Sequence, residues 1–440
     1  MADLTIVGAG PVGSLLALTL ARRGYSIEMY ERRPDMRRVE IAAGRSINLA
    51  VSTRGLHALR EVGLDAEALQ SAVPMLGRMT HALDGKLALL PYGRDASEYI
   101  NSMSRGGLNK LLMTKAEESG RVRIHFEQRL VDYDFTRKMA RFEDGSEAHA
   151  PVVVGTDGSA SALRAAMGGD VSQELLSSGY KELNMPPLPA GGFAMHVNAL
   201  HIWPRGQFML IALPNQDGSF TCTLFLPFEG PPSFAELRTE TDAQAFFAKH
   251  FPDAVPLIPG LAAQFMAAPL GKMATVKTWP WSRGSALLLG DAAHAIVPFF
   301  GQGMNAGFED VTLLSAMLDR GADFSKAFAR FAEQRKPDAD AIADLAVENF
   351  VEMRDKVADP TFLKMRAIEA DLQKRMPGRY LSRYQLVTFT RVPYRVALRA
   401  GEIQSGILAD LARLEPLDYS RGVQMVEEHL LPLLQRHLAP

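Results

Sequence analysis

The alternation of apolar and polar positions predicts a strand, a helix and a second strand within the first 31 residues. Residues 4–7 form an apolar run with β-branched side chains, which is typical of a buried parallel strand. Residues 14–23 carry an apolar face at helical spacing, and residues 27–31 follow as a second strand. This order predicts a β–α–β unit at the start of a parallel sheet.

Three glycines, Gly8, Gly10 and Gly13, stand between the first strand and the helix. At this spacing Gly8 permits a tight turn, Gly10 lets a pyrophosphate approach the backbone, and Gly13 lets the helix pack closely on the strand. The helix N-terminus offers free N–H groups and a positive dipole end to phosphates. Tyr30 and Glu31 end the second strand, where a carboxylate accepts hydrogen bonds from a ribose. We therefore predict dinucleotide binding; the alternative is a fold of this type that has lost its ligand.

Two later strands also end in an acid. Residues 151–154 lead to Asp157, and residues 286–289 lead to Asp291, with Gly303 shortly before a further helix from about residue 306. Ligands of open α/β sheets bind beyond the carboxyl ends of the strands. Three such ends in one chain therefore predict one long ligand across one sheet edge, and FAD has the required length.

The rest of the pattern predicts two further regions. Residues 75–94, 193–197, 208–213 and 220–226 read as strands of an antiparallel sheet, with a helix over 234–251. The pattern from residue 324 onward is helical. The predicted fold class is α/β: a Rossmann-like FAD-binding domain, an antiparallel-sheet substrate domain and a C-terminal helical region. The predicted boundaries are 1–74, 104–178 and 276–325 for the first, 75–103 and 179–275 for the second, and 326–440 for the third.

Composition narrows the function classes. The 440 residues carry a net charge of −2, which does not favour nucleic acid or an anionic membrane as the main partner. Cys222 is the single cysteine, so neither an intrachain disulfide nor a cysteine-based metal site is possible. No stretch has the roughly 18 consecutive apolar residues of a membrane span. We therefore expect a soluble, cytoplasmic protein without a metal.

At these motifs the chain resembles the class A flavoprotein aromatic hydroxylases of the p-hydroxybenzoate hydroxylase type. The residues that carry this likeness are 8–13, 157–158 and 290–291. A closer likeness to the kynurenine 3-monooxygenase family covers nearly the whole chain, through residues 44–50, 91–94, 180–183, 199–204, 298–305, 348–353 and 383–384. Eukaryotic members end in a membrane-anchoring helix. We expect no such anchor here, and so a bacterial-type enzyme.

The resemblance implies hydroxylation of L-kynurenine to 3-hydroxykynurenine with NADPH and dioxygen, through a flavin hydroperoxide on non-covalently bound FAD. The flavin carries the chemistry, so no catalytic side chain is assigned. The residues expected to bind FAD are Gly8, Gly10, Val12, Gly13, Tyr30, Glu31, Arg32, Arg33, Ala50, Arg105, Leu130, Asp157, Asp291, Gly303, Met304 and Asn305. The residues expected to bind kynurenine are Arg78, Tyr92, Asn349 and Tyr384 at its amino-acid end, and Ile211, Leu213, Phe225, Phe299 and Met353 around its ring. The residue types agree, because a carboxylate needs a guanidinium and an aromatic ring needs an apolar slot.

Other functions also fit parts of the sequence, and two further expectations concern NADPH binding and assembly. Trp279 and Trp281 resemble the Trp-x-Trp signature of flavin halogenases, but the Ile-Pro of that signature does not follow, so we expect both rings to pack beside the strand that leads to Gly290. A flavin oxidase, or a non-catalytic carrier like the Rab GDP-dissociation inhibitors, also fits the first motif. Arg37 and Arg38 are the candidate cations for the NADPH phosphate, with a solvated charge run as the alternative. For assembly we expect a homodimer.

Overall fold

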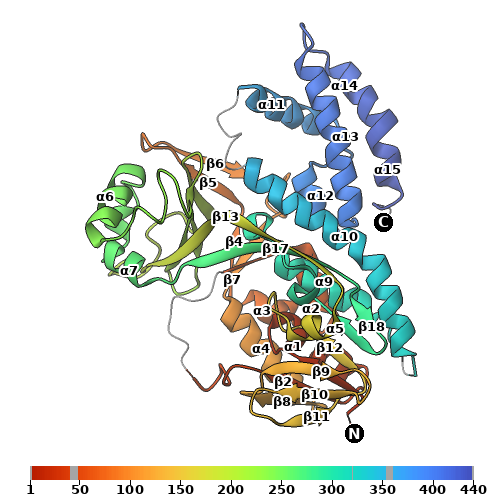
Figure 1. The fold of residues 1–440 in the computed structure, drawn as a ribbon. Helices are drawn as coiled ribbons and strands as arrows, with labels where there is room; N and C mark the ends of the chain where they lie inside the picture. Colours follow the sequence, from red (N-terminus) through yellow and green to blue (C-terminus); the bar gives the residue numbers. More distant parts are fainter. Residues whose placement is uncertain (1, 40–47, 320, 353–359, 439–440) are drawn as a thin grey trace.

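The computed structural model describes residues 2–39, 48–319, 321–352 and 360–438 (Figure 1). Its first region is built on a six-stranded sheet in the order β18-β19-β12-β1-β2-β8. These strands are Ser282–Arg283 (β18), Ala286–Leu288 (β19), Val153–Gly155 (β12), Leu4–Val7 (β1), Ile27–Glu31 (β2) and Val122–Phe126 (β8). All neighbours pair in parallel except β18 with β19, so the predicted β–α–β unit and parallel sheet are confirmed. The carboxyl ends of β1, β2, β12 and β19 therefore meet at one edge.

Helices complete this region. They are α1 (Pro11–Arg22), α4 (Arg105–Glu118), α5 (Ala162–Met167), α8 (Asp291–His294) and α9 (Gly303–Ser315). Residues 13–21 of α1 are all buried, because α4 and α9 contact the helix in addition to the sheet. α9 begins at Gly303 rather than at residue 306, directly after a 3₁₀ turn over Pro298–Phe300 and a left-handed Gly301. That early start brings the first turn of α9 to the same edge as the strand ends.

A seven-stranded sheet forms the second region, in the order β17-β13-β16-β15-β14-β5-β6. The strands are Gly271–Trp279 (β17), Asp170–Met185 (β13), Phe220–Pro227 (β16), Met209–Pro214 (β15), Ala199–Pro204 (β14), Gly77–His81 (β5) and Leu87–Pro91 (β6). One pair, β14 with β5, is parallel, which the prediction of a wholly antiparallel sheet missed. The β5–β6 hairpin comes from an early part of the chain. It pairs with β14 through β5, although no short turn joins these two strands. β13 and β17 run continuously through residues 178 and 275, where the sequence placed domain boundaries.

Two sequence predictions for this region were wrong in detail. Residues 193–197 form bends and coil instead of a strand, since Gly191 and Gly192 before them have φ of +85° and +87°. The Phe193 ring packs edge-on against Phe220 at 5.8 Å between centroids. The helix predicted over 234–251 begins at residue 240 as α6 (Glu240–His250), because Thr239 caps it in a capping box. α6 and α7 (Leu261–Ala267) share a buried core with this sheet.

Two small sheets and two short helices complete these two regions. One sheet, β3-β7-β4, joins Leu49–Val51, Ile100–Met103 and Ala72–Met75, and the other, β11-β10-β9, joins Glu147–His149, Met139–Phe142 and Leu130–Asp134. The helices are α2 (Thr53–Glu61) and α3 (Asp65–Leu69). β3 and β7 bring Ala50 and Ile100 to the junction between the two large sheets.

The third region is helical, as predicted, and lies at the upper right of Figure 1. Its helices are α10 (Phe324–Val351), α11 (Pro360–Arg375), α12 (Arg383–Phe389), α13 (Tyr394–Ala412), α14 (Tyr419–Met425), a π-helical turn over Val426–Leu430, and α15 (Leu431–Gln435). Their core includes Phe225, Phe299 and Phe300 from the other two regions, so the helices pack directly on the junction. Within the described ranges no helix combines the length and apolarity needed to cross a bilayer.

Candidate cofactor and substrate site

One cavity of about 790 Å³ runs from the carboxyl edge of the parallel sheet to the seven-stranded sheet. It is lined by most of the predicted cofactor residues: Gly8, Gly10, Val12, Tyr30, Glu31, Arg32, Arg33, Ala50, Arg105, Leu130, Asp157, Asp291, Gly303 and Met304. At its other end it is lined by Arg78, Tyr92, Ile211, Leu213, Phe225, Phe299 and Tyr384 of the predicted substrate residues. The sequence analysis missed further lining residues, among them Asn48, Met75, Leu200, Met209, Ile296 and Phe300. Their positions depend on strand alternation and on contacts between distant segments.

Four predicted residues need separate comment. Gly13 and Asn305 lie behind the cavity wall, and Asn349 is also not among the lining residues. Met353 lies outside the described residues.

The glycine motif forms a backbone cradle at the end of β1. Gly8 has φ of +99°, and a Cβ there would lie 2.5 Å from the Thr156 carbonyl oxygen. A Cβ on Gly13 would lie 2.1 Å from the Gly8 oxygen, so Gly13 serves close packing. A Cβ on Gly10 would meet nothing within 4 Å and would project into open space, which is the room that a pyrophosphate needs. Thr156 secures the cradle, since its hydroxyl donates to the Gly8 oxygen at 2.8 Å, a role that the sequence analysis did not assign.

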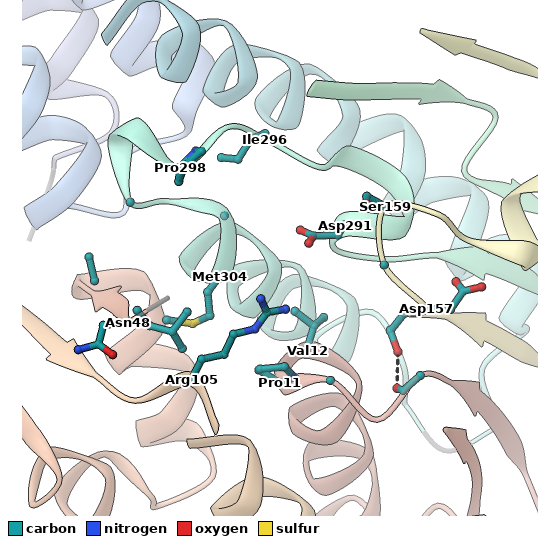
Figure 2. Close-up of a pocket in the computed structure, with 18 of the residues that line it drawn as sticks. Pro11, Val12, Asn48, Arg105, Asp157, Ser159, Asp291, Ile296, Pro298 and Met304 are labelled. Atoms are coloured by element: carbon teal, nitrogen blue, oxygen red, sulfur yellow. Dashed lines mark hydrogen bonds between the residues drawn. The ribbon is translucent and has the colours of Figure 1, made fainter. Parts of the chain in front are cut away.

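Three acids stand around this cradle. The Glu31 carboxylate is buried and accepts from the Ala9 N–H at 2.8 Å and from the Arg33 N–H at 3.0 Å, which fixes it at the end of β2. Asp157 Oδ2 accepts from the Ala162 N–H at 2.8 Å, whereas its Oδ1 is buried without a partner among the described residues. Burial raises the pKa of Asp157, and its carboxylate is turned away from the middle of the cavity (Figure 2). Asp291 begins α8 and turns its carboxylate toward the middle of the cavity (Figure 2).

The first turn of α9 faces the middle of the cavity. Gly303 and Met304 line it, and Arg105 approaches from α4 on the other side (Figure 2). Neither the Gln302 side chain at the N-cap nor any acid in the first turn satisfies the N–H groups of this helix end. Asn305 is fully buried instead: its Oδ1 accepts from the Ser52 N–H at 2.9 Å, and its Nδ2 donates to the Ala50 oxygen at 2.8 Å. This side chain joins α9 to β3, and the free N–H groups remain available to an anionic edge of a ligand.

The far end of the cavity holds a guanidinium beside two stacked phenols. The Arg78 Cζ lies 5.4 Å from the Tyr92 ring centroid and 5.1 Å from that of Tyr384, and the two rings stack at 5.4 Å. Arg78 Nε is buried without a hydrogen-bond partner among the described residues, and none of their carboxylates forms an ion pair with this arginine. Burial raises the pKa of both tyrosines, so both phenols are protonated at neutral pH. The group is equipped to bind a carboxylate.

Apolar side chains join this group to the α9 end. Ile211, Leu213 and Phe225 form the sheet side of the wall, and Phe299 covers the other side at 5.0 Å from the Phe225 ring. Asn349 on α10 supports Phe299 from behind, since its Nδ2 donates to the Phe299 carbonyl oxygen at 2.8 Å. The amide of Asn349 therefore lies behind the wall of the slot.

The structure also locates the two candidate cations for the NADPH phosphate and the two tryptophans of the Trp-x-Trp pair. Arg37 is engaged by Asp35 at 2.8 Å and by Glu117 at 2.6 Å, which makes Arg38, with its side chain 86% exposed, the more accessible cation of that turn. Trp281 is buried and stacks on His294 as expected, but Trp279 is 41% exposed and packs less than predicted. The Trp-x-Trp pair therefore contributes one core residue and one surface residue.

The donors and open spaces of the cavity fit FAD. Gly10 leaves room for a pyrophosphate, and the N–H groups of α9 suit an anionic flavin edge. The cavity continues past that edge to Arg78, so it has space for a second ligand beside the flavin position.

Comparisons with known proteins agree with this geometry. The family model described as "FAD binding domain" matches residues 1–346. Kynurenine 3-monooxygenase from Myxococcus xanthus is 54% identical over 448 residues, covering 99% of this chain and 97% of that protein. Its counterpart from Xanthomonas oryzae pv. oryzae is 48% identical over 450 residues, covering 99% and 98%. The fold is similar to that of a Klebsiella pneumoniae HpxO variant complexed with FAD, with a TM-score of 0.69, 20% identity, and coverage of 86% and 96%.

These matches extend over the glycine cradle, both sheets and the helical region, and the two relatives are similar to almost the whole chain. The chain belongs to the kynurenine 3-monooxygenase family of FAD-binding aromatic hydroxylases.

Proposed function

We propose that this protein hydroxylates L-kynurenine at position 3 of its aromatic ring, with FAD as cofactor, NADPH as reductant and dioxygen as oxidant. The observation that carries the proposal is the Arg78 guanidinium beside Tyr92 and Tyr384, at the end of an apolar slot that begins at α9. Kynurenine has the matching order of groups: an amino acid at one end and an aromatic amine at the other.

Each part of the cavity has a role in this proposal. When bound, FAD would supply the redox chemistry between NADPH and dioxygen. Arg78 binds the substrate carboxylate, and the Tyr92 and Tyr384 hydroxyls are protonated donors beside it. The walls formed by Ile211, Phe225 and Phe299 hold the ring and keep water away from it. The first turn of α9 holds the anionic edge of the reduced flavin.

The substrate residues act by position. Fixing the carboxylate at Arg78 sets the distance between the aromatic ring and the flavin, and a misplacement of about 1 Å costs about two orders of magnitude in rate. Asn349 contributes in the proposal by holding the Phe299 wall, and a direct contact with the amino-acid end is the alternative role.

The test is turnover by the purified protein. It should be yellow with flavin absorbance, and L-kynurenine should stimulate its NADPH oxidation and yield 3-hydroxykynurenine. Stimulated oxidation that releases only hydrogen peroxide would indicate an oxidase, and a halogenated product formed with added halide would indicate a halogenase. A colourless, folded protein that does not bind added FAD would contradict the proposal.

A further inference from the structure

Gln302 occupies the N-cap position of α9 but does not cap the helix. The side chain is 1% exposed and is held by two other elements. Its Nε2 donates to the Ser52 hydroxyl at 3.3 Å, where α2 begins, and its Oε1 accepts from the Tyr394 hydroxyl at 3.0 Å, where α13 begins. The amide oxygen is thereby directed away from the first turn of its own helix.

The Tyr394 ring is itself held by two arginines. The Arg54 Cζ lies 4.0 Å from the ring centroid and the Arg335 Cζ lies 5.6 Å from it. Both arginines form ion pairs with Glu309 in the second turn of α9, at 2.9 Å for Arg335. The phenol is fully buried, and burial raises its pKa, so it stays a hydrogen-bond donor across the neutral range.

This network also reaches the backbone of Gly290, the residue before Asp291. Asp310, next to Glu309, accepts from Arg335 Nε at 2.7 Å and from the Gly290 N–H at 3.1 Å. His294 of α8 contacts the same carboxylate at 2.6 Å. Ion pairs among buried charged side chains therefore connect Tyr394 to the elements that line the cavity. Each of these side chains has less than a tenth of its surface exposed.

We propose that Tyr394 is a positioning residue for the flavin: by holding the Gln302 amide oxygen, it keeps the first-turn N–H groups of α9 free for the anionic edge of reduced FAD. The inference rests on the proposed function, because it requires that edge of FAD at α9. A released amide oxygen at the N-cap position would compete for the N–H groups of residues 303–305. This competition would weaken the binding of reduced flavin more than that of oxidised flavin, since only the reduced form carries a negative charge at the edge that faces α9.

The first test changes Gln302 alone and leaves Tyr394 in place. Gln302→Asn is too short to keep the Tyr394 contact and introduces a favoured N-cap residue, whereas Gln302→Met keeps the volume and has no competing oxygen. The measurement is the midpoint potential of the bound flavin by equilibration with a reference dye. If Gln302→Asn binds reduced flavin tenfold more weakly relative to oxidised flavin, its midpoint potential falls by about 30 mV. The potential of Gln302→Met should stay near that of the wild type.

A second pair of variants tests Tyr394 itself. Tyr394→Phe should lower the potential in the same direction, and Tyr394→Phe combined with Gln302→Met should restore it. Tyr133→Phe is the matched control, because its buried hydroxyl donates to the Ala150 oxygen at 2.7 Å, outside the cavity. Equal potentials in Gln302→Asn and Gln302→Met would overturn the inference, as would a shift in Tyr394→Phe that the added Gln302→Met leaves in place. Wild-type turnover of kynurenine reports separately on the proposed function.

Discussion

Replacing Arg78 with methionine removes the only charge that the proposed substrate contact provides and keeps a side chain of similar length. Wild-type Arg78 offers two parallel N–H donors to a carboxylate, and its Nε is buried without a partner among the described residues. Hydrogen bonds to charged groups contribute roughly 1.5–3 kcal/mol each. A loss of about 2.7 kcal/mol corresponds to a hundredfold change in affinity, so Arg78→Met should weaken kynurenine binding by at least that factor.

The assay compares two enzymes with two ligands. Wild type and Arg78→Met are titrated with L-kynurenine and with its decarboxylated analogue, and the flavin absorbance reports binding. The analogue lacks the group that Arg78 serves, so its affinity should hardly change. Arg78→Met should also release more hydrogen peroxide per NADPH at saturating kynurenine, because a loosely held ring is misplaced relative to the flavin.

Two controls separate this contact from general damage. FAD content should be unchanged, since Arg78 lies at the far end of the cavity from the glycine cradle. Arg205→Met removes another part-buried arginine of the same sheet region, one that donates to the His250 oxygen at 2.6 Å and not into the cavity, and it should leave kynurenine affinity unchanged. If Arg78→Met discriminates between the two ligands by the same factor as wild type, Arg78 does not bind the carboxylate.

Four further outcomes are expected. Gly10→Val should purify folded but with little FAD, because its side chain fills the open space beside the cradle; full FAD occupancy, measured by absorbance, would contradict this. Asn349→Ala should weaken kynurenine binding and leave FAD content unchanged, and unchanged affinity would give Asn349 a purely structural role. Arg38→Glu should raise the apparent KM for NADPH more than that for NADH, whereas equal effects would indicate general damage. Burial raises the pKa of Glu182 to about 7, so the folded state favours its protonated form and loses stability as pH rises from about 4.5 to 7; Glu182→Gln should therefore raise the melting temperature more at pH 8 than at pH 5.

Patterns within short stretches of the sequence predict the features that are formed by neighbouring residues of the chain. The glycine cradle, the parallel strands and the acids at their ends follow from residue order, because strand, turn and helix are adjacent in the chain. The parallel pairing of β5 with β14 does not follow, since it joins segments more than a hundred residues apart. The predicted strand over 193–197 failed because the composition of those residues resembles a strand but the preceding glycines turn the backbone.

The candidate site likewise contains residues that could be identified from the sequence and contacts that only the fold creates. Arg78, Tyr92 and Tyr384 were named through resemblance, and only the fold brings residues so distant in sequence into contact. The network around Tyr394 was not predicted, because ion pairs between α2, α9 and α10 leave no mark within any one segment. One signal within a single segment was present: Glu309 and Asp310 are two adjacent acids in an otherwise uncharged helix, and buried charges require partners.

The support of Phe299 by Asn349 has a consequence for how this enzyme could diverge. The match to the FAD binding domain model ends at residue 346, yet one wall of the substrate slot is held by α10 beyond that point and one phenol of the Arg78 group belongs to α12. Evolution can therefore alter which aromatic amino acid is accepted by changing the last quarter of the chain, while the nucleotide-binding half keeps its sequence. In a directed search for new substrates, a library confined to the last turn of α10 and to α12 would reshape the slot and leave the glycine cradle and the Tyr394 network unchanged.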